Sequence, residues 1–160
     1  MAKGDLENGV PEVVGRIPSG CCILTARHAS RQTGMLLSWM QQASFQPLLL
    51  SMAIRMGRPI LELLEASKAC TLNLLGEEPR EMLRHFGRGF QIDEAAFVGL
   101  ACAEVQSGVV LKDAIGYLEC SIESRLAAGD HWLYLVCPER GRLLQSGSPY
   151  VHLRKSALTY

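Results

Sequence analysis

Alternation of apolar and polar side chains is clearest in the last third of the chain. From residue 117 to 125 the two types alternate, as in Leu118-Glu119-Cys120-Ser121. A period of two predicts a half-buried β-strand. A Gly-Asp turn then leads into an apolar strand at 131–137. The Pro-Glu-Arg-Gly stretch at 138–141 predicts a hairpin into a last short strand at 142–145.

Shorter apolar runs separated by turn residues fill the first half of the chain. They predict strands at 20–26, 34–39 and 48–54, and the short turns between them favour antiparallel pairing. A further strand at 69–75 would place Thr71 and Asn73 on one face.

Helical patterns are few and short. Pro59 opens an amphipathic helix over 59–67, a second helix is expected at 79–86, and one more helical turn at 93–97. The chain is therefore predicted to be mainly β, antiparallel, with a few short helices. With six or seven strands, closure into a small barrel would remove exposed sheet edges, and a β-sandwich is the alternative.

Composition limits the possible classes of partner. The 160 residues suit one domain, 48% are hydrophobic, and 16 Lys and Arg balance 16 Asp and Glu. Zero net charge gives no support for a nucleic-acid or anionic-membrane partner. No apolar run approaches the roughly 20 residues of a membrane span, and the polar start resembles no signal peptide. We expect a cytoplasmic protein with a flexible segment at 1–16 and one domain at 17–160.

The six cysteines include no C-x-x-C pair, and most lie within apolar runs. They are typical of small buried hydrophobic residues in a reducing compartment. His28, His85 and His152 show no metal-ligand spacing with cysteine or carboxylates, so no metal is expected.

The segment 38–47 combines apolar residues with short polar ones, namely Ser38, Gln41, Gln42 and Ser44. Such a segment suits a flat amphipathic ligand, which needs hydrogen bonds along its edge and apolar contact on its face. A flavin ring fits this description. An ordinary strand–turn–strand connection explains the same pattern.

Several short motifs occur in one order along the chain. They are Ser-Trp-x-x-Gln-Ala-Ser-Phe-x-Pro at 38–47, Leu-Asn-Leu-Leu at 72–75, His-Phe at 85–86, Leu-Lys-Asp-Ala at 111–114, Tyr-Leu-Glu-Cys at 117–120 and Gly-Asp-His-Trp at 129–132. This series resembles the flavin reductase-like family, whose fold is the FMN-binding split barrel. With Val-His-Leu-Arg-Lys-Ser at 151–156, it is most similar to the C-terminal flavin reductase module of diflavin flavodiiron proteins.

Three positions depart from the family pattern. Leu48 stands where a second proline is common, Leu153 replaces one of two paired histidines, and Ala157 replaces a glycine. None of these is a predicted flavin residue, but the end of the chain could be arranged differently.

The resemblance implies bound FMN, NAD(P)H as co-substrate, and hydride transfer between them. The flavin-binding residues that it implies are Leu36, Leu37, Ser38, Trp39, Gln42, Ala43, Ser44, Asn73 and Leu74. Arg58, or its neighbour Arg55, would bind the FMN phosphate. His131 would face the flavin and position the nicotinamide, which makes it the candidate catalytic residue.

Structural roles remain open for several of these residues. Trp39 could belong to the core, Asn73 could satisfy backbone groups, and His131 could cap a hairpin. Many surface arginines bind no ligand, so Arg58 has the same alternative.

The first functional hypothesis is an NAD(P)H-dependent flavin reductase that passes electrons to free flavin or to a partner. The alternatives are an FMN-binding electron-transfer protein without its own nicotinamide site and a split-barrel module that has lost its cofactor. The family pattern also implies a homodimer with flavin at the subunit interface. The sequence does not choose between NADH and NADPH, since it contains no Rossmann fingerprint.

Overall fold

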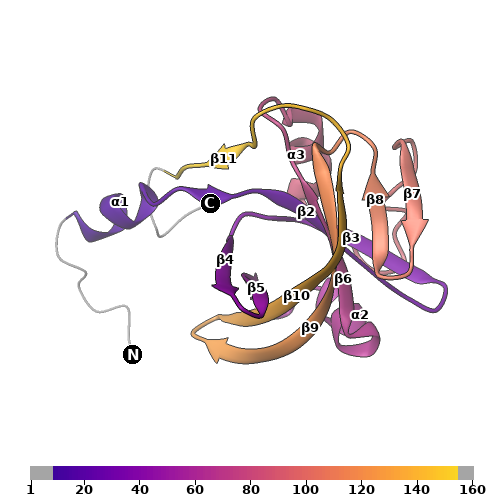
Figure 1. Cartoon of the computed structure of the whole chain (residues 1–160), viewed down its shortest axis with the longest axis horizontal. Helices are drawn as coiled ribbons and strands as arrows, with labels where there is room; N and C mark the ends of the chain where they lie inside the picture. The colour runs from indigo at the N-terminus through magenta and orange to yellow at the C-terminus, as the bar shows by residue number, and fades with distance from the viewer. Residues whose placement is uncertain (1–8, 155–160) are drawn as a thin grey trace.

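The structure is a computed structural model that describes residues 9–154. Its helices are α1 (Val10–Gly15), α2 (Ile60–Ser67) and α3 (Arg80–Gly87). Its strands are β1 (Ser19–Gly20), β2 (Cys22–His28), β3 (Arg31–Leu37), β4 (Met40–Phe45), β5 (Leu48–Arg55), β6 (Ala69–Leu74), β7 (Cys102–Val105), β8 (Gly108–Leu111), β9 (Gly116–Ala128), β10 (His131–Leu143) and β11 (Val151–His152). Figure 1 shows their arrangement.

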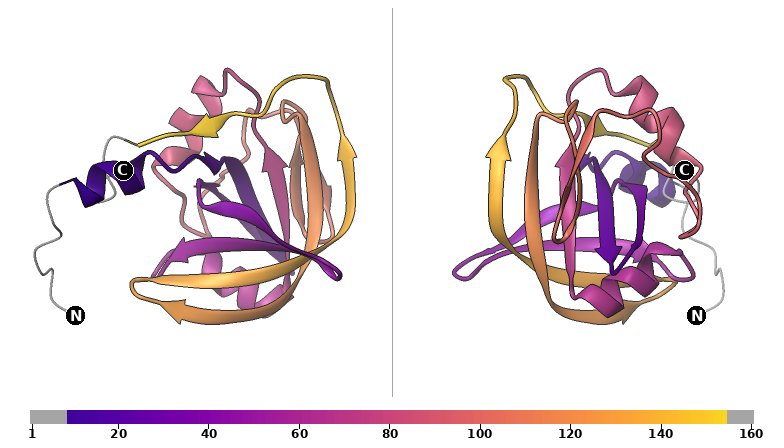
Figure 2. Two further views of the ribbon diagram at one scale, coloured as in Figure 1. Left: turned by 60° about the vertical axis from the view of Figure 1, so that its left-hand side comes forward. Right: turned by 90° about the vertical axis from the view of Figure 1, so that its right-hand side faces the viewer.

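One antiparallel sheet forms the body of the molecule. Its seven strands follow the order β3-β2-β6-β9-β10-β5-β4, and the sheet curls strongly on itself (Figure 2). The edge strands β3 and β4 are consecutive in the chain, and they form no ladder with each other. The mainly β, antiparallel prediction is confirmed, and the sheet is not closed, so the barrel is split and keeps two edges.

The first core fills the space between the curled sheet and α2. Cys22 and Leu24 of β2 point into it, together with Tyr134 of β10 and Leu63 of α2, and all four are fully buried. Alternate residues of each strand contribute, as a period of two requires.

A second core lies on the opposite face of β2. Here Ile23 packs with Phe86 of α3 and with Val109 and Leu111 of the β7–β8 hairpin. Because β2 is buried on both faces, its sequence shows a continuous apolar run rather than alternation.

Side chains attach strand β8 to the sheet. Thr25 Oγ1 donates to the Val109 carbonyl and accepts from the Val109 amide, both at 2.9 Å. Asn73 Nδ2 donates to the same carbonyl at 2.9 Å, and Asn73 Oδ1 accepts from the Leu111 amide at 2.8 Å. We call Thr25, Asn73 and their β8 partners the polar seam. It satisfies buried backbone groups that a hairpin outside the main sheet would otherwise leave unpaired.

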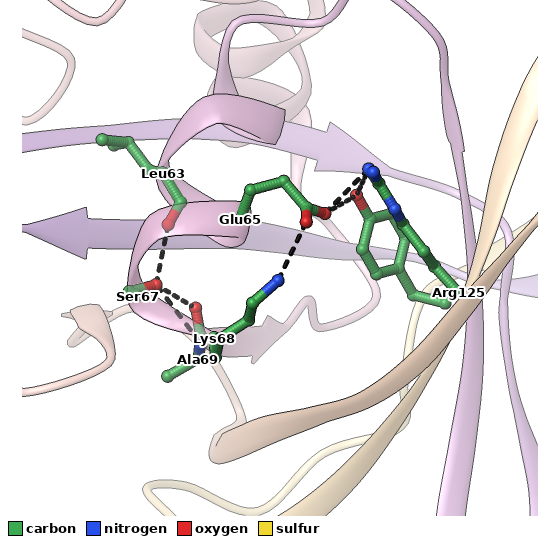
Figure 3. A network of polar contacts seen from close by, with 7 residues as sticks. Leu63, Glu65, Ser67, Lys68, Ala69 and Arg125 are labelled. Carbon is green, nitrogen blue, oxygen red and sulfur yellow. Dashed lines mark hydrogen bonds and ion pairs between the residues drawn. The ribbon is translucent and has the colours of Figure 1, made fainter.

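A charged network joins α2 to the long strands β9 and β10 (Figure 3). The Glu65 carboxylate accepts from Lys68 Nζ at 2.9 Å and from the Tyr134 hydroxyl at 2.9 Å, and it pairs with Arg125 Nη1 at 2.8 Å. Burial opposes ionisation of Glu65, but its hydrogen bonds from Lys68 and Tyr134 and the charge of Arg125 outweigh it. The pKa of the Glu65 carboxyl therefore lies below its usual value.

Four cysteines are buried in the two cores. Burial raises the pKa of Cys21 to about 11 and that of Cys22 well above its ordinary value. Contact with Cys120, its direct partner across the β6–β9 ladder, and burial raise the pKa of Cys70 in the same way. The thiols of Cys21, Cys22 and Cys70 are therefore protonated, and the buried cysteines act as small apolar side chains, as the sequence predicted.

Two predicted elements are wrong. No hairpin forms at 138–141, because β10 continues through these residues to Leu143 and stays paired with β9. A register shift between Pro138 and Arg140 accommodates the proline, which cannot donate to a regular ladder. The stretch 93–97 forms turns rather than a helical turn.

Four strands were not predicted, namely β4, β7, β8 and the two-residue β11. The polar residues after Ser38 form strand β4, an edge strand paired only with β5, whose exposed side tolerates polar side chains. Strands β7 and β8 have four residues each, which is too short for a clear period. Part of the expected flexible segment 1–16 forms α1, and residues 1–8 lie outside the described range.

Replacement of Gly108 by alanine should destabilise the protein. An added Cβ would lie 2.6 Å from Thr25 Oγ1 and 2.9 Å from the Thr25 carbonyl oxygen, within the polar seam. We expect a loss of about 1–3 kcal/mol in the free energy of unfolding, measured by urea denaturation. The control is Gly87→Ala, whose Cβ would meet nothing within 4 Å. Equal stability of the two variants would contradict the seam's importance.

The Glu65 network should make stability pH-dependent on the acid side. A lowered folded-state pKa means that the carboxylate stabilises the fold above the ordinary value of 4.5 and loses this effect as pH falls through the lowered value. Wild-type protein should therefore exceed Glu65→Gln in free energy of unfolding at neutral pH, and the difference should vanish in acid. Urea denaturation across this pH range measures it. The control is Glu62→Gln. Glu62 lies on the same helix as Glu65, and its ion pair with Arg31 of β3 is more exposed. A difference that persists in acid would refute the assignment.

Candidate functional site

A pocket of about 270 Å³ lies where β3 passes into β4. Residues from five parts of the chain line it: Met35, Leu36, Leu37, Ser38, Trp39, Ala53, Arg55, Arg58, Gly87 and His152. Five of the predicted site residues, Leu36 to Trp39 and Arg58, thus meet in one pocket, together with Arg55.

The crossing between β3 and β4 shapes one wall. Leu37 ends β3 with its side chain in the first core, and Ser38 is 9% exposed. The Trp39 carbonyl accepts a hydrogen bond from the Ala53 amide of β5 at 3.0 Å, which fixes the crossing against the opposite edge of the sheet. The pocket therefore forms at the split of the barrel.

The pocket is basic. Arg55 ends β5, and Arg58 stands in the turn before α2, where the Arg58 amide donates to the Arg55 carbonyl at 3.4 Å. Gly57 between them has a φ of +82°, a conformation that favours glycine and lets the chain turn sharply into the helix. Within residues 9–154 no acidic side chain lines the pocket, so its two arginines suit an anionic group.

His131 lies beside this pocket. It begins β10 directly opposite Arg55 of β5, and its ring centroid is 4.7 Å from that of Trp39. Its Nδ1 lies 2.7 Å from Asp130 Oδ1, and this hydrogen bond lowers the pKa of the Asp130 carboxyl. In the neutral ring the carboxylate therefore holds the proton on Nδ1. Nε2 is buried and has no hydrogen-bond partner among residues 9–154.

Strand β11 covers part of the pocket from the other end of the chain. It pairs with β1 through Ser19 and His152, which places His152 in the lining. Beyond it, the Arg154 guanidinium lies 4.8 Å from the centre of the Trp39 ring. Burial, with the nearby charge of Arg154, lowers the pKa of His152 from its ordinary 6.5. The sequence placed His152 at the family's paired histidines and ruled it out as a metal ligand, but it gave His152 no role in the flavin site.

The remaining predicted flavin residues lie outside this pocket. Gln42 and Ala43 are exposed on β4, Ser44 is half-buried, and the Gln42 side chain donates to the Ser44 carbonyl. Asn73 is fully buried in the polar seam, which is the structural alternative noted from the sequence. Leu74 borders a separate hollow of about 480 Å³ together with Leu48 and Tyr117. Their role in flavin binding stays a prediction.

Within residues 9–154 no helix has the length and apolar character to cross a membrane. In the same range, no group of three or more His, Cys, Asp or Glu side chains is placed to hold a metal ion.

Comparison with known proteins gives the family. The model of the flavin reductase like domain matches residues 14–158, nearly the whole chain. The chain belongs to the flavin reductase-like family.

Curated relatives of the chain are diflavin flavoproteins. The chain is 38% identical to diflavin flavoprotein A 6 of Nostoc sp. over 154 residues, which cover 94% of this chain and 27% of that protein. It is 33% identical to diflavin flavoprotein A 1 of Synechocystis sp. over 153 residues, again 94% of this chain and 27% of the other. The chain thus spans about a quarter of the length of these relatives and corresponds to their flavin reductase module.

Solved structures of flavin reductases share the fold. The NADH:FAD oxidoreductase SgcE6 of Streptomyces globisporus matches with a TM-score of 0.80 and 19% identity, covering 90% of this chain and 86% of that one. Flavin reductase HpaC, solved with NADP+, matches with a TM-score of 0.74 and 19% identity, covering 89% and 90%. At these identities the likeness concerns the fold.

Proposed function

We propose that this protein binds FMN and uses NAD(P)H to reduce flavin, passing the electrons to free flavin or to a partner. The observation that carries the proposal is the convergence of Ser38, Trp39 and Arg58 in one pocket, with the His131 ring in tilted contact with Trp39. Membership of the flavin reductase-like family supports the same reading.

The residues of the pocket fit FMN. Leu36 offers apolar surface and Ser38 a hydroxyl, which suits an amphipathic ring, while Arg55 and Arg58 suit the FMN phosphate. The buried Nε2 atoms of His131 and His152 lack partners among the described residues, and a bound ligand would supply them.

FMN held with its ring at Ser38 and Trp39 and its phosphate at Arg55 and Arg58 would supply the redox chemistry, as the acceptor of a hydride from NAD(P)H. The protein's own residues position the reactants. With its proton on Nδ1, His131 presents a lone pair at Nε2 that can accept from the carboxamide N–H of a nicotinamide. Asp130 acts by fixing this tautomer. Trp39, held between His131 and Arg154, excludes water from one side of the pocket.

A homodimer is part of the proposal. At about 270 Å³ the pocket lies below the ~300–1,000 Å³ usual for sites that enclose a whole small molecule. Strand β4 beside it is a sheet edge, and its exposed Gln42 and Ala43 are predicted flavin residues. Phe45 at its end is 90% exposed, which is unusual for a large apolar side chain without a partner. A second subunit seated on this edge would complete the flavin site.

The decisive experiment follows oxidation of NADH and of NADPH by the protein with FMN, by the absorbance of the reduced nicotinamide. We expect turnover with at least one donor. His131→Ala should reduce turnover roughly a hundredfold, because the nicotinamide is no longer positioned, while FMN affinity stays unchanged.

His28→Ala, at an exposed position outside the pocket, serves as the control. FMN binding with no oxidation of either donor would instead favour the electron-transfer protein without a nicotinamide site. Failure to bind FMN would favour a barrel that has lost its cofactor.

The homodimer predicts a solution mass of two chains by light scattering. Phe45→Glu places a charge on the exposed end of β4 and should shift the mass toward one chain, because burying an unpaired carboxylate at an interface is costly. Val98→Glu, at another exposed apolar residue away from β4, should leave the mass unchanged. A wild-type mass of one chain would contradict the dimer.

A further inference from the structure

We propose that His152, brought into the pocket by strand β11, is a third ligand of the flavin phosphate beside Arg55 and Arg58. The inference rests on the proposed FMN site and deepens it. It assigns a binding role to the C-terminal strand.

The first support is position. His152 lines the same pocket as both arginines, although it lies about a hundred residues further along the chain. Pairing of His152 with Ser19 of β1 holds the backbone there, and the Arg154 amide donates to the Gly15 carbonyl at 3.1 Å. The backbone is therefore fixed at His152 itself and again two residues after it.

The second support is an unmet hydrogen bond. His152 Nε2 is buried and lacks a partner within residues 9–154. A buried polar nitrogen left unpaired is costly, so its persistence suggests a group that completes it. None of the described side chains that line the pocket is bonded to this nitrogen, and a ligand bound there would complete it.

The third support is charge. Within residues 9–154, the charged groups near His152 are Arg154 after β11 and the two pocket arginines Arg55 and Arg58, and no carboxylate of this range lines the pocket. Burial, together with the charge of Arg154, disfavours the imidazolium while the pocket holds no anion, and it lowers the pKa of His152. A phosphate with nearly two negative charges would reverse the balance and accept a hydrogen bond from Nε2–H.

The test compares FMN with riboflavin, which lacks the phosphate, by quenching of flavin fluorescence on the full chain. His152→Ala should weaken FMN binding about tenfold and leave riboflavin binding unchanged, the size expected for one charge-assisted hydrogen bond. Arg58→Ala should show the same selectivity. His152→Gln keeps an N–H donor and should recover part of the loss, and His28→Ala should match wild type.

A second measurement uses the unmutated protein. The imidazole nitrogen resonances of His152, assigned by comparison with His152→Ala, should shift when FMN is added and stay in place with riboflavin. Equal losses for both flavins, or no loss, would overturn the phosphate role while the flavin site stands. Absence of binding by either flavin to wild-type protein would overturn the FMN site and this inference together.

Discussion

Attachment of the β7–β8 hairpin through side chains is the constraint on which the rest of the molecule depends. Strand β2 lies between two cores, so its outer face needs a cover as apolar as its inner one. Strand β8 lies over the sheet and cannot join the ladder of that sheet. The amides and carbonyls of β8 that face the sheet therefore need other partners. Thr25 and Asn73 provide them from β2 and β6. With both faces buried, β2 holds β3 firmly up to Leu37, where the pocket begins.

The candidate site is assembled from segments that are far apart in sequence. The β3–β4 crossing, the turn before α2, the start of β10 and strand β11 all meet at the split of the barrel. The ladder between β5 and β10 sets His131 opposite Arg55, so a shift of one residue would turn the imidazole to the other face. The open side of the barrel thus leaves room for a ligand. The continuous strands around the pocket keep its walls rigid.

The sequence predicted what short-range patterns control. Strands β5, β6 and β9 and helices α2 and α3 were expected close to their observed bounds, because apolar period and proline position are local signals. The hairpin at 138–141 was wrong because a bulge absorbs Pro138 within β10, and bulges depend on the partner strand. Strand β4 was read as a connection, since an edge strand carries few of the apolar residues that reveal a strand.

For the site, sequence motifs led to Leu36, Ser38 and Arg58 but not to His152, whose position depends on a two-residue pairing with β1. The structure also gives Asn73 a complete set of partners inside the fold, which the motif alone could not show.

Burial of the cysteines has a consequence for an oxidoreductase. The thiols of Cys22 and Cys70, kept protonated and away from solvent by burial, are poor nucleophiles and resist alkylation and oxidation while the protein is folded.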